Sequence, residues 1–202
     1  WEGVTAKSWN KKIFNYIKDQ VDKSSRDLAE IKGACPDAEE YGIKERFSNK
    51  TAVAPTASIS IICGGASPGI EPIAANVFSH KTLSGTFTVR NSHLKRLLTE
   101  KGQDNDEVWI SILNNRGSVQ HLDFLSDHEK DVFKTAIELD QRWLIDLAAD
   151  RTEMIDQAQS LNVFVPADSD KKYIHDIHYS AWKKGVKSLY YCRSQSIQRA
   201  ET

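Results

Sequence analysis

The stretch SLNVFVPADSDKKYIHDIHYSAWKKGVKSLYY, residues 160–191, decides the fold class that the sequence predicts. Residues 160–165 are largely apolar, as in a strand, and Asp168 or Ser169 is placed to cap a following helix. Residues 186–191 form the second predicted strand. A strand, a helix and a strand of this length predict a right-handed parallel crossover, and therefore an α/β fold. The inner side of the helix would carry Ile174, Ile177, Ala181 and Trp182.

A long amphipathic helix is predicted near the start of the chain, capped by Ser8 and ended by Gly33. Pro36 follows in the turn-like stretch GACPDAEEYG, so residues 1–45 form a leading helix and turn. The apolar positions repeat with the period of a helix and would form one face, which consists of Ile13, Phe14, Ile17, Val21, Leu28 and Ile31.

A strand–turn–helix unit follows, with small residues at its turn. Residues 51–54 form a short predicted strand that ends at Pro55, and ASISIIC (57–63) forms a short predicted helix. Thr56 and Ser58 are residue types that cap helices. The start of a helix carries unsatisfied N–H groups and a partial positive charge, which suit a phosphate. Taken alone, however, this motif favours an ordinary helix cap.

The middle of the chain predicts a hairpin and several short helices. Residues 76–79 and 86–90 are the two strands of the hairpin, and Ser92 would cap the helix that follows. Residues 107–113 form another short helix. Ser126 begins an S-x-x-E capping box that opens a helical stretch reaching Leu147, with a break near Asp140.

The composition is that of an ordinary soluble domain of 202 residues with a formal net charge of -1. Such a charge gives no general attraction to nucleic acid or to an anionic membrane. No apolar run approaches the roughly 20 residues that span a bilayer. The first residue is Trp1 rather than Met, which suggests a fragment or a processed chain.

Three cysteines with wide spacing argue against a disulfide framework or a zinc site and fit a reducing cytoplasm. Each is expected to be a small buried hydrophobe, although one reactive thiol stays an alternative. His175 and His178 have a spacing that can chelate a metal, but without further ligands solvated histidines are favoured. No metal site is therefore predicted.

Four stretches, in this order and spacing, together resemble the large, catalytic subunit of class I ribonucleotide reductases. They are APTASISIICGGASPGIEP (54–72), NVFSHKTLSGTF (76–87), MIDQAQSLNVFVPAD (154–168) and SAWKKGVKSLYYCRS (180–194). The likeness spans roughly residues 46–200 and looks closest to T-even-type phage versions. No single motif is specific, whereas the colinear set is.

The resemblance implies a fold and an activity. The whole chain, 1–202, would be the C-terminal portion of a ten-stranded α/β barrel, with an inserted hairpin and several helices. The family reduces ribonucleoside diphosphates to deoxyribonucleotides for DNA synthesis by thiyl-radical chemistry. Thioredoxin or glutaredoxin supplies the reducing equivalents, and a metal cofactor of the small subunit supplies the radical. ATP and dNTP effectors would bind elsewhere, and this segment would bind no cofactor directly.

The resemblance also assigns residues. Pro55, Thr56, Ala57, Ser58 and Ile59 match the loop that holds the substrate's diphosphate, where binding would rely on backbone amides and the two hydroxyl groups. The family's reactive cysteine matches no cysteine here, so it would lie on an upstream part of the subunit. The chain alone would then have no turnover, and in a phage-infected cell the enzyme would work in the host cytoplasm.

Tyr190 and Tyr191 match two adjacent tyrosines that relay radical equivalents from the small subunit towards the reactive cysteine. Neighbouring residues of a regular strand point to opposite faces, so a shared relay requires the backbone to leave strand geometry here. Without the resemblance, two tyrosines at a strand end, one buried and one exposed, would be the default.

Other polar residues have weaker assignments. Glu71, in the glycine-rich loop, is expected to be structural. The polar residues Gln157, Gln159, Ser160 and Asn162 would either lie near substrate or form a satisfied network. Two further functions stay open: a non-catalytic nucleotide-binding or assembly module derived from the reductase, and an unrelated phosphate-binding α/β barrel enzyme, for instance a flavin-dependent one.

Overall fold

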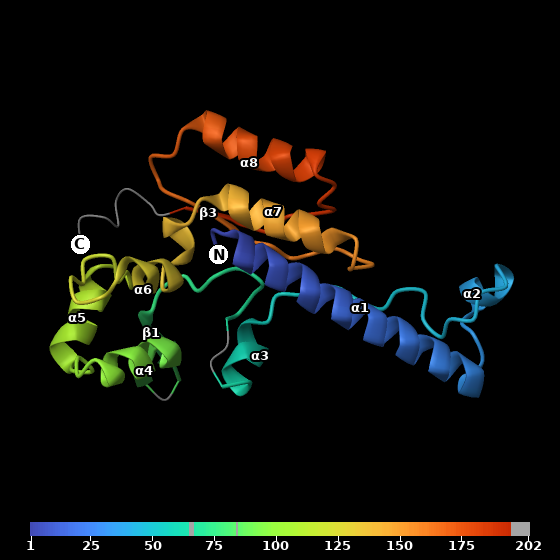
Figure 1. Ribbon diagram of the computed structural model, residues 1–202, viewed down its shortest axis with the longest axis horizontal. Helices are drawn as coiled ribbons and strands as arrows, with labels where there is room; N and C mark the ends of the chain where they lie inside the picture. The colour runs from blue at the N-terminus through green and yellow to red at the C-terminus, as the bar shows by residue number, and fades with distance from the viewer. Residues whose placement is uncertain (65–66, 84, 195–202) are drawn as a thin grey trace. The chain divides into compact units, whose positions relative to one another are not determined.

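The computed structural model describes residues 1–64, 67–83 and 85–194. The chain divides into two compact units (Figure 1). The first unit consists of Trp1–Pro55 and Asp140–Thr202, and the second consists of Thr56–Leu139. The two predicted site motifs are divided between them, because Tyr190 and Tyr191 belong to the first unit and Thr56 begins the second.

The first unit combines helices with one pair of strands. In Figure 1, α7 and α8 lie side by side, and α7 also packs against α1. The strands β3 and β4 are parallel, with Val163 opposite Cys192. The elements are α1 (Val4–Lys32), α2 (Pro36–Glu40), α7 (Gln141–Thr152), β3 (Val163–Val165), α8 (Lys171–Lys183) and β4 (Cys192–Ser194).

The predicted crossover between parallel strands is confirmed, but its boundaries differ. β3 begins at Val163 and not at residue 160, and β4 begins at Cys192, beyond the predicted range 186–191. Asp170 caps α8, since its side chain accepts from Lys172 N, so the assignment of the cap to Asp168 or Ser169 was wrong. Several adjacent residues of cap-forming type make this position hard to choose from local sequence.

The buried side of α8 is only partly as predicted. Ile177 and Ala181 are buried, whereas Trp182 is 73% exposed, so the expectation of an inward-facing Trp182 was wrong. Trp182 instead contacts the ring of Tyr179, with 5.7 Å between the ring centroids.

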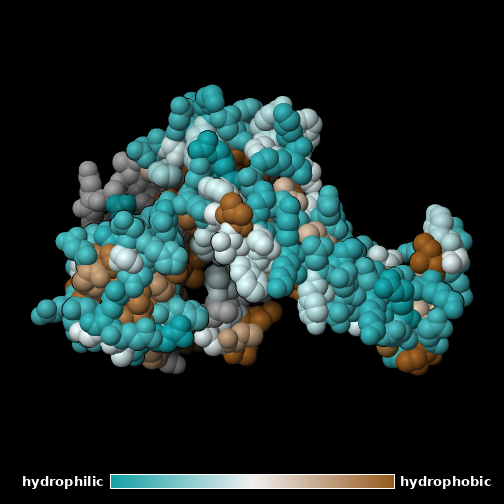
Figure 2. All heavy atoms as spheres, in the orientation of Figure 1, coloured by the Kyte–Doolittle hydropathy of each residue, from teal (hydrophilic) through white to brown (hydrophobic). Residues whose placement is uncertain are grey.

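The long helix α1 begins at Val4, earlier than the predicted cap Ser8, and ends as predicted before Gly33, whose φ of 81° suits glycine. Its apolar face is less buried than the periodicity predicts. Ser25 and Ala29 are buried, while Ile13 and Ile31 are exposed. Figure 2 shows apolar atoms at the surface where α1 ends and α2 follows.

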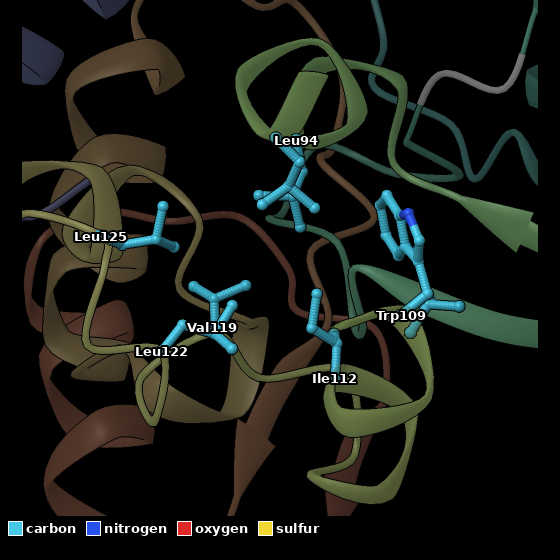
Figure 3. Close-up of a cluster of buried hydrophobic side chains, with 8 residues drawn as sticks. Leu94, Trp109, Ile112, Val119, Leu122 and Leu125 are labelled. Carbon is cyan, nitrogen blue, oxygen red and sulfur yellow. The ribbon is translucent and has the colours of Figure 1, made fainter. Parts of the chain in front are cut away.

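The second unit has its own hydrophobic core, shown in Figure 3. Leu94, Trp109, Ile112 and Val119 each have at most 2% of their surface exposed and converge from two helices and the loop after them. The elements are α3 (Ala57–Ile62), β1 (Val77–Thr82), β2 (Gly85–Arg90), α4 (Ser92–Glu100), α5 (Asp106–Asn114), α6 (Asp127–Val132) and the 3-10 helix η1 (Ala136–Glu138).

The predicted hairpin is confirmed, because β1 and β2 pair in antiparallel fashion from Val77 opposite Arg90. Asn91 caps α4, in place of the predicted Ser92, because its side chain accepts from the N–H groups of His93 and Leu94. The capping box of Ser126 and Glu129 is present at α6. The helical stretch that follows is broken twice. α6 ends at Val132, η1 spans Ala136–Glu138, and α7 begins at Gln141.

The strands of the described ranges form two sheets of two strands each. Instead of a strand at 51–54, one parallel bridge joins Val53 to Gln159. The closed ten-stranded barrel therefore stays a prediction. Among the described helices, none has both the length and the apolar character to cross a membrane.

The cysteines are not the buried residues that were expected. Cys63 and Cys192 are exposed, and Cys35 is half-buried. All three are free thiols, as the absence of a disulfide framework in the sequence pattern indicated. The prediction failed because burial depends on packing that an isolated cysteine position does not reveal.

Candidate functional site

The start of α3 places the backbone N–H groups of a first helical turn where the sequence predicts a phosphate loop. Ser60 N donates to Thr56 O at 2.8 Å and closes the first helical turn. The N–H groups of Ala57, Ser58 and Ile59 precede this bond and have no partner within the helix. Thr56 itself is held from the other side, because its N–H donates to Pro68 O at 2.9 Å.

The side chains around this turn leave it accessible. Ala57, Ser58 and Ile59 are exposed, as is Pro55, whereas Thr56 is half-buried. Ser60 is buried and donates from Oγ to Ala57 O at 2.9 Å, and this hydrogen bond stabilises the turn. Three successive amides and a nearby hydroxyl group can bind an anion without a lysine.

The segment that leads into the turn is fixed by Asp156. One carboxylate oxygen of Asp156 accepts from Lys50 N at 2.7 Å and from Thr51 N at 3.2 Å. In return, Asp156 N donates to Thr51 Oγ1 at 3.0 Å. Asp156 was not predicted from the sequence, because no motif indicates a carboxylate that binds backbone N–H groups more than a hundred residues away.

Gln159, one of the polar residues before β3, is part of a satisfied network with α7. Gln159 is buried, accepts from Arg151 Nε at 2.9 Å, and donates to Ala148 O at 2.9 Å. It also donates to Thr152 Oγ1 at 3.1 Å. For Gln159, the second of the two open interpretations therefore holds, and its bonds join the segment before β3 to α7.

Tyr190 and Tyr191 lie against each other. Their ring centroids are 4.0 Å apart, with 49° between the ring planes. A hydrogen bond between the two phenol groups raises the pKa of Tyr190. Both rings remain about half exposed. The two side chains therefore share one side of the chain, as a relay between them requires.

The backbone leaves strand geometry at this point, as predicted, by means of a bulge. The register of Val163 opposite Cys192 includes a bond from Val163 N to Tyr191 O at 2.9 Å. A regular parallel ladder would continue with a bond from Tyr191 N to Leu161 O. Instead, Leu161 O accepts from Tyr190 N at 2.8 Å. Two tyrosines thus occupy the place of one residue, and the extra residue brings both rings to the same side.

Arg193 adds a cation to the pair. Its guanidinium carbon lies 5.2 Å from the ring centroid of Tyr191, within the range of a cation–π contact. Arg193 follows the tyrosines in β4, and sequence reasoning did not single it out. The predicted strand ended at Tyr191, so Arg193 was assigned to the tail after it, whereas β4 reaches Ser194.

The remaining candidates have structural surroundings. Glu71 is buried beside Gly69, where a Cβ atom would lie 2.7 Å from the Glu71 carboxylate. This close approach agrees with the structural role expected of Glu71. His175 stacks on Tyr179, and His178 Nδ1 lies 2.8 Å from Ile174 O. In the part of the chain that the structure describes, no three His, Cys, Asp or Glu residues gather in a way that would hold a metal ion.

Two shallow cavities of the first unit lie away from the predicted residues. One, of about 380 Å³, lies between α1 and residues 47–50, and the other, of about 470 Å³, lies between α1 and the end of α7. None of the predicted phosphate-loop or tyrosine residues lines either cavity. Tyr190 and Tyr191 are thus in contact with each other, and Thr56 forms one helical turn with the three residues after it.

Comparison with known proteins gives the family. Residues 37–192 match the family model described as ribonucleotide reductase, barrel domain. The ribonucleoside-diphosphate reductase large subunit of Invertebrate iridescent virus 3 is 46% identical over 97% of this chain. That of Caenorhabditis elegans is 38% identical over 77% of the chain. The chain spans only 31% and 20% of the lengths of these two relatives.

A solved structure agrees with this match. The Actinobacillus ureae class Id ribonucleotide reductase alpha subunit superposes with a TM-score of 0.87 and 37% identity. The superposition covers 96% of this chain and 35% of the other. Together with the family model, which covers most of the chain, it shows that the chain belongs to the ribonucleotide reductase barrel-domain family.

Proposed function

We propose that the chain is the C-terminal component of a class I ribonucleoside-diphosphate reductase large subunit. In the proposed enzyme it completes a ten-stranded α/β barrel, with residues 1–45 as a leading helix and turn and 46–202 as the segment that carries the family motifs. The reactive cysteine lies on an upstream part of the subunit. The product is a deoxyribonucleotide for DNA synthesis, and the compartment is the cytoplasm. The relatives from an iridescent virus and a nematode leave the likeness to T-even-type phage versions an expectation.

The observation that carries the proposal is the contact between the two tyrosine rings, 4.0 Å apart, with their phenol groups hydrogen-bonded. When one ring is a neutral radical, an electron and a proton pass to it together from the other phenol. The first tyrosine is thereby reduced and the second becomes the radical, without a charged intermediate. The small subunit, which holds a metal cofactor, would supply the radical, and thioredoxin or glutaredoxin would supply reducing equivalents.

The start of α3 is the proposed site for the substrate's diphosphate. The first-turn N–H groups of Ala57, Ser58 and Ile59 carry the partial positive charge of the helix end. Thr56 and Ser58 add hydroxyl donors, and Pro55 directs the chain into the turn. The exposure of this turn supports the assignment, since an incoming diphosphate needs access to the amides.

The test reconstitutes the enzyme from this chain, an upstream polypeptide that carries the reactive cysteine, and the small subunit. Formation of deoxyribonucleotide from ribonucleoside diphosphate is measured with thioredoxin or glutaredoxin as reductant. Tyr190→Phe and Tyr191→Phe should each abolish turnover, because phenylalanine has no oxidisable phenol, and nucleotide binding should persist. Tyr41→Phe, at an exposed tyrosine of the leading segment, is the matched control.

Two results would decide against the proposal. Full activity of both phenylalanine variants would exclude the relay. A folded complex that binds nucleoside diphosphate but never turns it over would instead support a non-catalytic nucleotide-binding or assembly module.

A further inference from the structure

The bulge at the tyrosine pair displaces one backbone N–H group from the ladder of hydrogen bonds. Because Leu161 O is taken by Tyr190 N, the N–H of Tyr191 has lost its ladder acceptor. A backbone N–H that is shielded from water without an acceptor destabilises the fold, because it loses its hydrogen bond to water and gains none in return. A bulge without a substitute acceptor would therefore tend to revert to a regular ladder.

Asn162 supplies the substitute. Its Oδ1 accepts from Tyr191 N at 3.2 Å. Asn162 is the single residue opposite the two tyrosines, and it lies between Leu161 and Val163, each only 1% exposed. Asn162 itself is 9% exposed, so a polar side chain is buried between two apolar neighbours. An amide at this position is explained by the hydrogen bond that it makes.

We infer that Asn162 is a positioning residue for the tyrosine pair, holding both phenols on one side of the strand by accepting the N–H that the bulge displaces. In this role Asn162 acts through the backbone of Tyr191. The inference rests on the proposed function, in which the two rings exchange an electron and a proton. Such exchange falls steeply when the phenols separate, so a small loosening of the backbone should reduce the rate.

The test uses the large subunit that contains this chain, assembled with its small subunit. Asn162→Leu keeps the approximate size of the side chain and removes the acceptor. Asn162→Asp keeps an acceptor oxygen in the same place. Ser188→Ala is the matched control, because Ser188 Oγ donates to Gln159 O at 3.3 Å and so joins the same two segments without touching the tyrosines.

Two measurements are made on each variant. Hydrogen exchange of the Tyr191 amide, followed by mass spectrometry, should accelerate about tenfold in Asn162→Leu, as loss of one backbone hydrogen bond predicts. It should change little in Asn162→Asp and Ser188→Ala. Turnover should show a lower kcat in Asn162→Leu with an unchanged KM for the nucleotide, whereas general damage to the fold would raise KM and lower thermal stability as well.

The outcomes separate the inference from the proposed function. Unchanged exchange and unchanged kcat in Asn162→Leu would overturn the positioning role, even if Tyr190→Phe is inactive. Should Asn162→Leu fail to fold, Asn162→Asp decides, since loss of Tyr191 protection in that variant would equally overturn it. If exchange accelerates while Tyr190→Phe keeps full activity, Asn162 positions the pair but the relay is wrong.

Discussion

The guanidinium of Arg151, in α7, donates a hydrogen bond from Nη1 to Asn10 Oδ1, in α1, at 3.0 Å. Arg151 is only 2% exposed, and its cation also lies over the ring of Phe14, 5.4 Å from the centroid. Asn10 closes the link from its other side, since Nδ2 donates to Leu147 O at 3.0 Å. The two helices are thus joined through one buried cation and one amide.

Replacement of Asn10 should therefore destabilise the first unit. Asn10→Ala removes an acceptor from a buried charged donor and should lower the free energy of unfolding by about 1–3 kcal/mol. Asn15→Ala is the control, because Asn15 is exposed on the same helix and bonds only within it, to Lys11 O. Urea unfolding of both variants makes the comparison, and equal stabilities would contradict the role of Asn10.

The Lys50–Asp22 pair should make stability depend on pH. Lys50 Nζ lies 2.6 Å from Asp22 Oδ1, and both side chains are largely buried. The hydrogen bond from Lys50 is the main cause that lowers the pKa of Asp22 below its ordinary 3.8, against burial, which acts in the opposite direction. Burial lowers the pKa of Lys50, but the bonds and charges of Asp22 and Glu45 outweigh it and raise the pKa above 10.5.

The direction of each pKa shift determines how the stability depends on pH. The lowered pKa of Asp22 contributes stability above pH 3.8 that is lost as the pH falls through its folded-state pKa. The raised pKa of Lys50 contributes stability below pH 10.5 that is lost as the pH rises through its folded-state value. Lys50→Met should cost about 1–2 kcal/mol at neutral pH and less below pH 3.8.

Chemical unfolding at several pH values tests this dependence. Lys44→Met is the control, because the Lys44–Glu30 pair is exposed and should contribute little. If the free energy of unfolding lost in Lys50→Met stays constant down to strongly acid pH, the variant has lost packing rather than the ion pair.

Gly117 should tolerate no side chain. Its φ is 81°, and a Cβ atom there would lie 2.4 Å from Ala75 Cβ and 2.9 Å from Asn76 N. Asn76 binds Gly117 O through both its backbone N–H and its Nδ2, so neither segment of this contact can withdraw cheaply. Gly117→Ala should destabilise the second unit by about 3 kcal/mol or more.

Gly102→Ala provides the matched comparison in the same unit. Gly102 has a similar φ of 68°, but no atom lies within 4 Å of the place that a methyl group would take, so only backbone strain of about 1 kcal/mol should appear. Thermal unfolding of the two variants separates the cost of backbone strain from the cost of the steric clash with Ala75. Equal losses would show that the contact with Ala75 relaxes freely.

Ser58 offers a test of the phosphate turn by charge alone. Ser58→Asp adds an anion to the first turn of α3, which helix electrostatics favour but which repels a diphosphate. In the reconstituted enzyme, the Kd for ribonucleoside diphosphate should rise about tenfold or more in Ser58→Asp, while Ser58→Asn, of the same shape and no charge, should bind nearly normally. Similar affinities for both variants would move the phosphate site elsewhere.

Local signals predicted local structure well. The S-x-x-E pattern at Ser126 gave its capping box because all the interacting atoms lie within one turn. The caps at Asn91 and Asp170 were missed by one or two residues, since neighbouring residues of similar type compete and only the chain's approach to the helix decides. The strand expected at 186–191 begins only at Cys192, because the bulge at Tyr190 and Tyr191 interrupts the regular pairing with the segment before β3.

Contacts between residues far apart in the chain could not be predicted from sequence patterns. The period of α1 gave the helix but not the exposure of Ile13, which depends on what packs there. Asp156 accepts from Lys50 N before the proposed phosphate turn, and Asn162 accepts the N–H of Tyr191. Both are ordinary polar residues in the sequence. Only the requirement of a shared side for Tyr190 and Tyr191 made the irregular backbone foreseeable.

The bulge also constrains how this part of the chain can change length. Deleting either tyrosine would restore a continuous ladder of backbone hydrogen bonds from Leu161 to Val165, and it would take from Asn162 Oδ1 the N–H that this oxygen now accepts. The surviving phenol would then stand alone in a protein that keeps the pairing of β3 and β4. Deletion of Tyr190 or of Tyr191 is therefore the change that a screen for folding would pass and a screen for deoxyribonucleotide formation would reject.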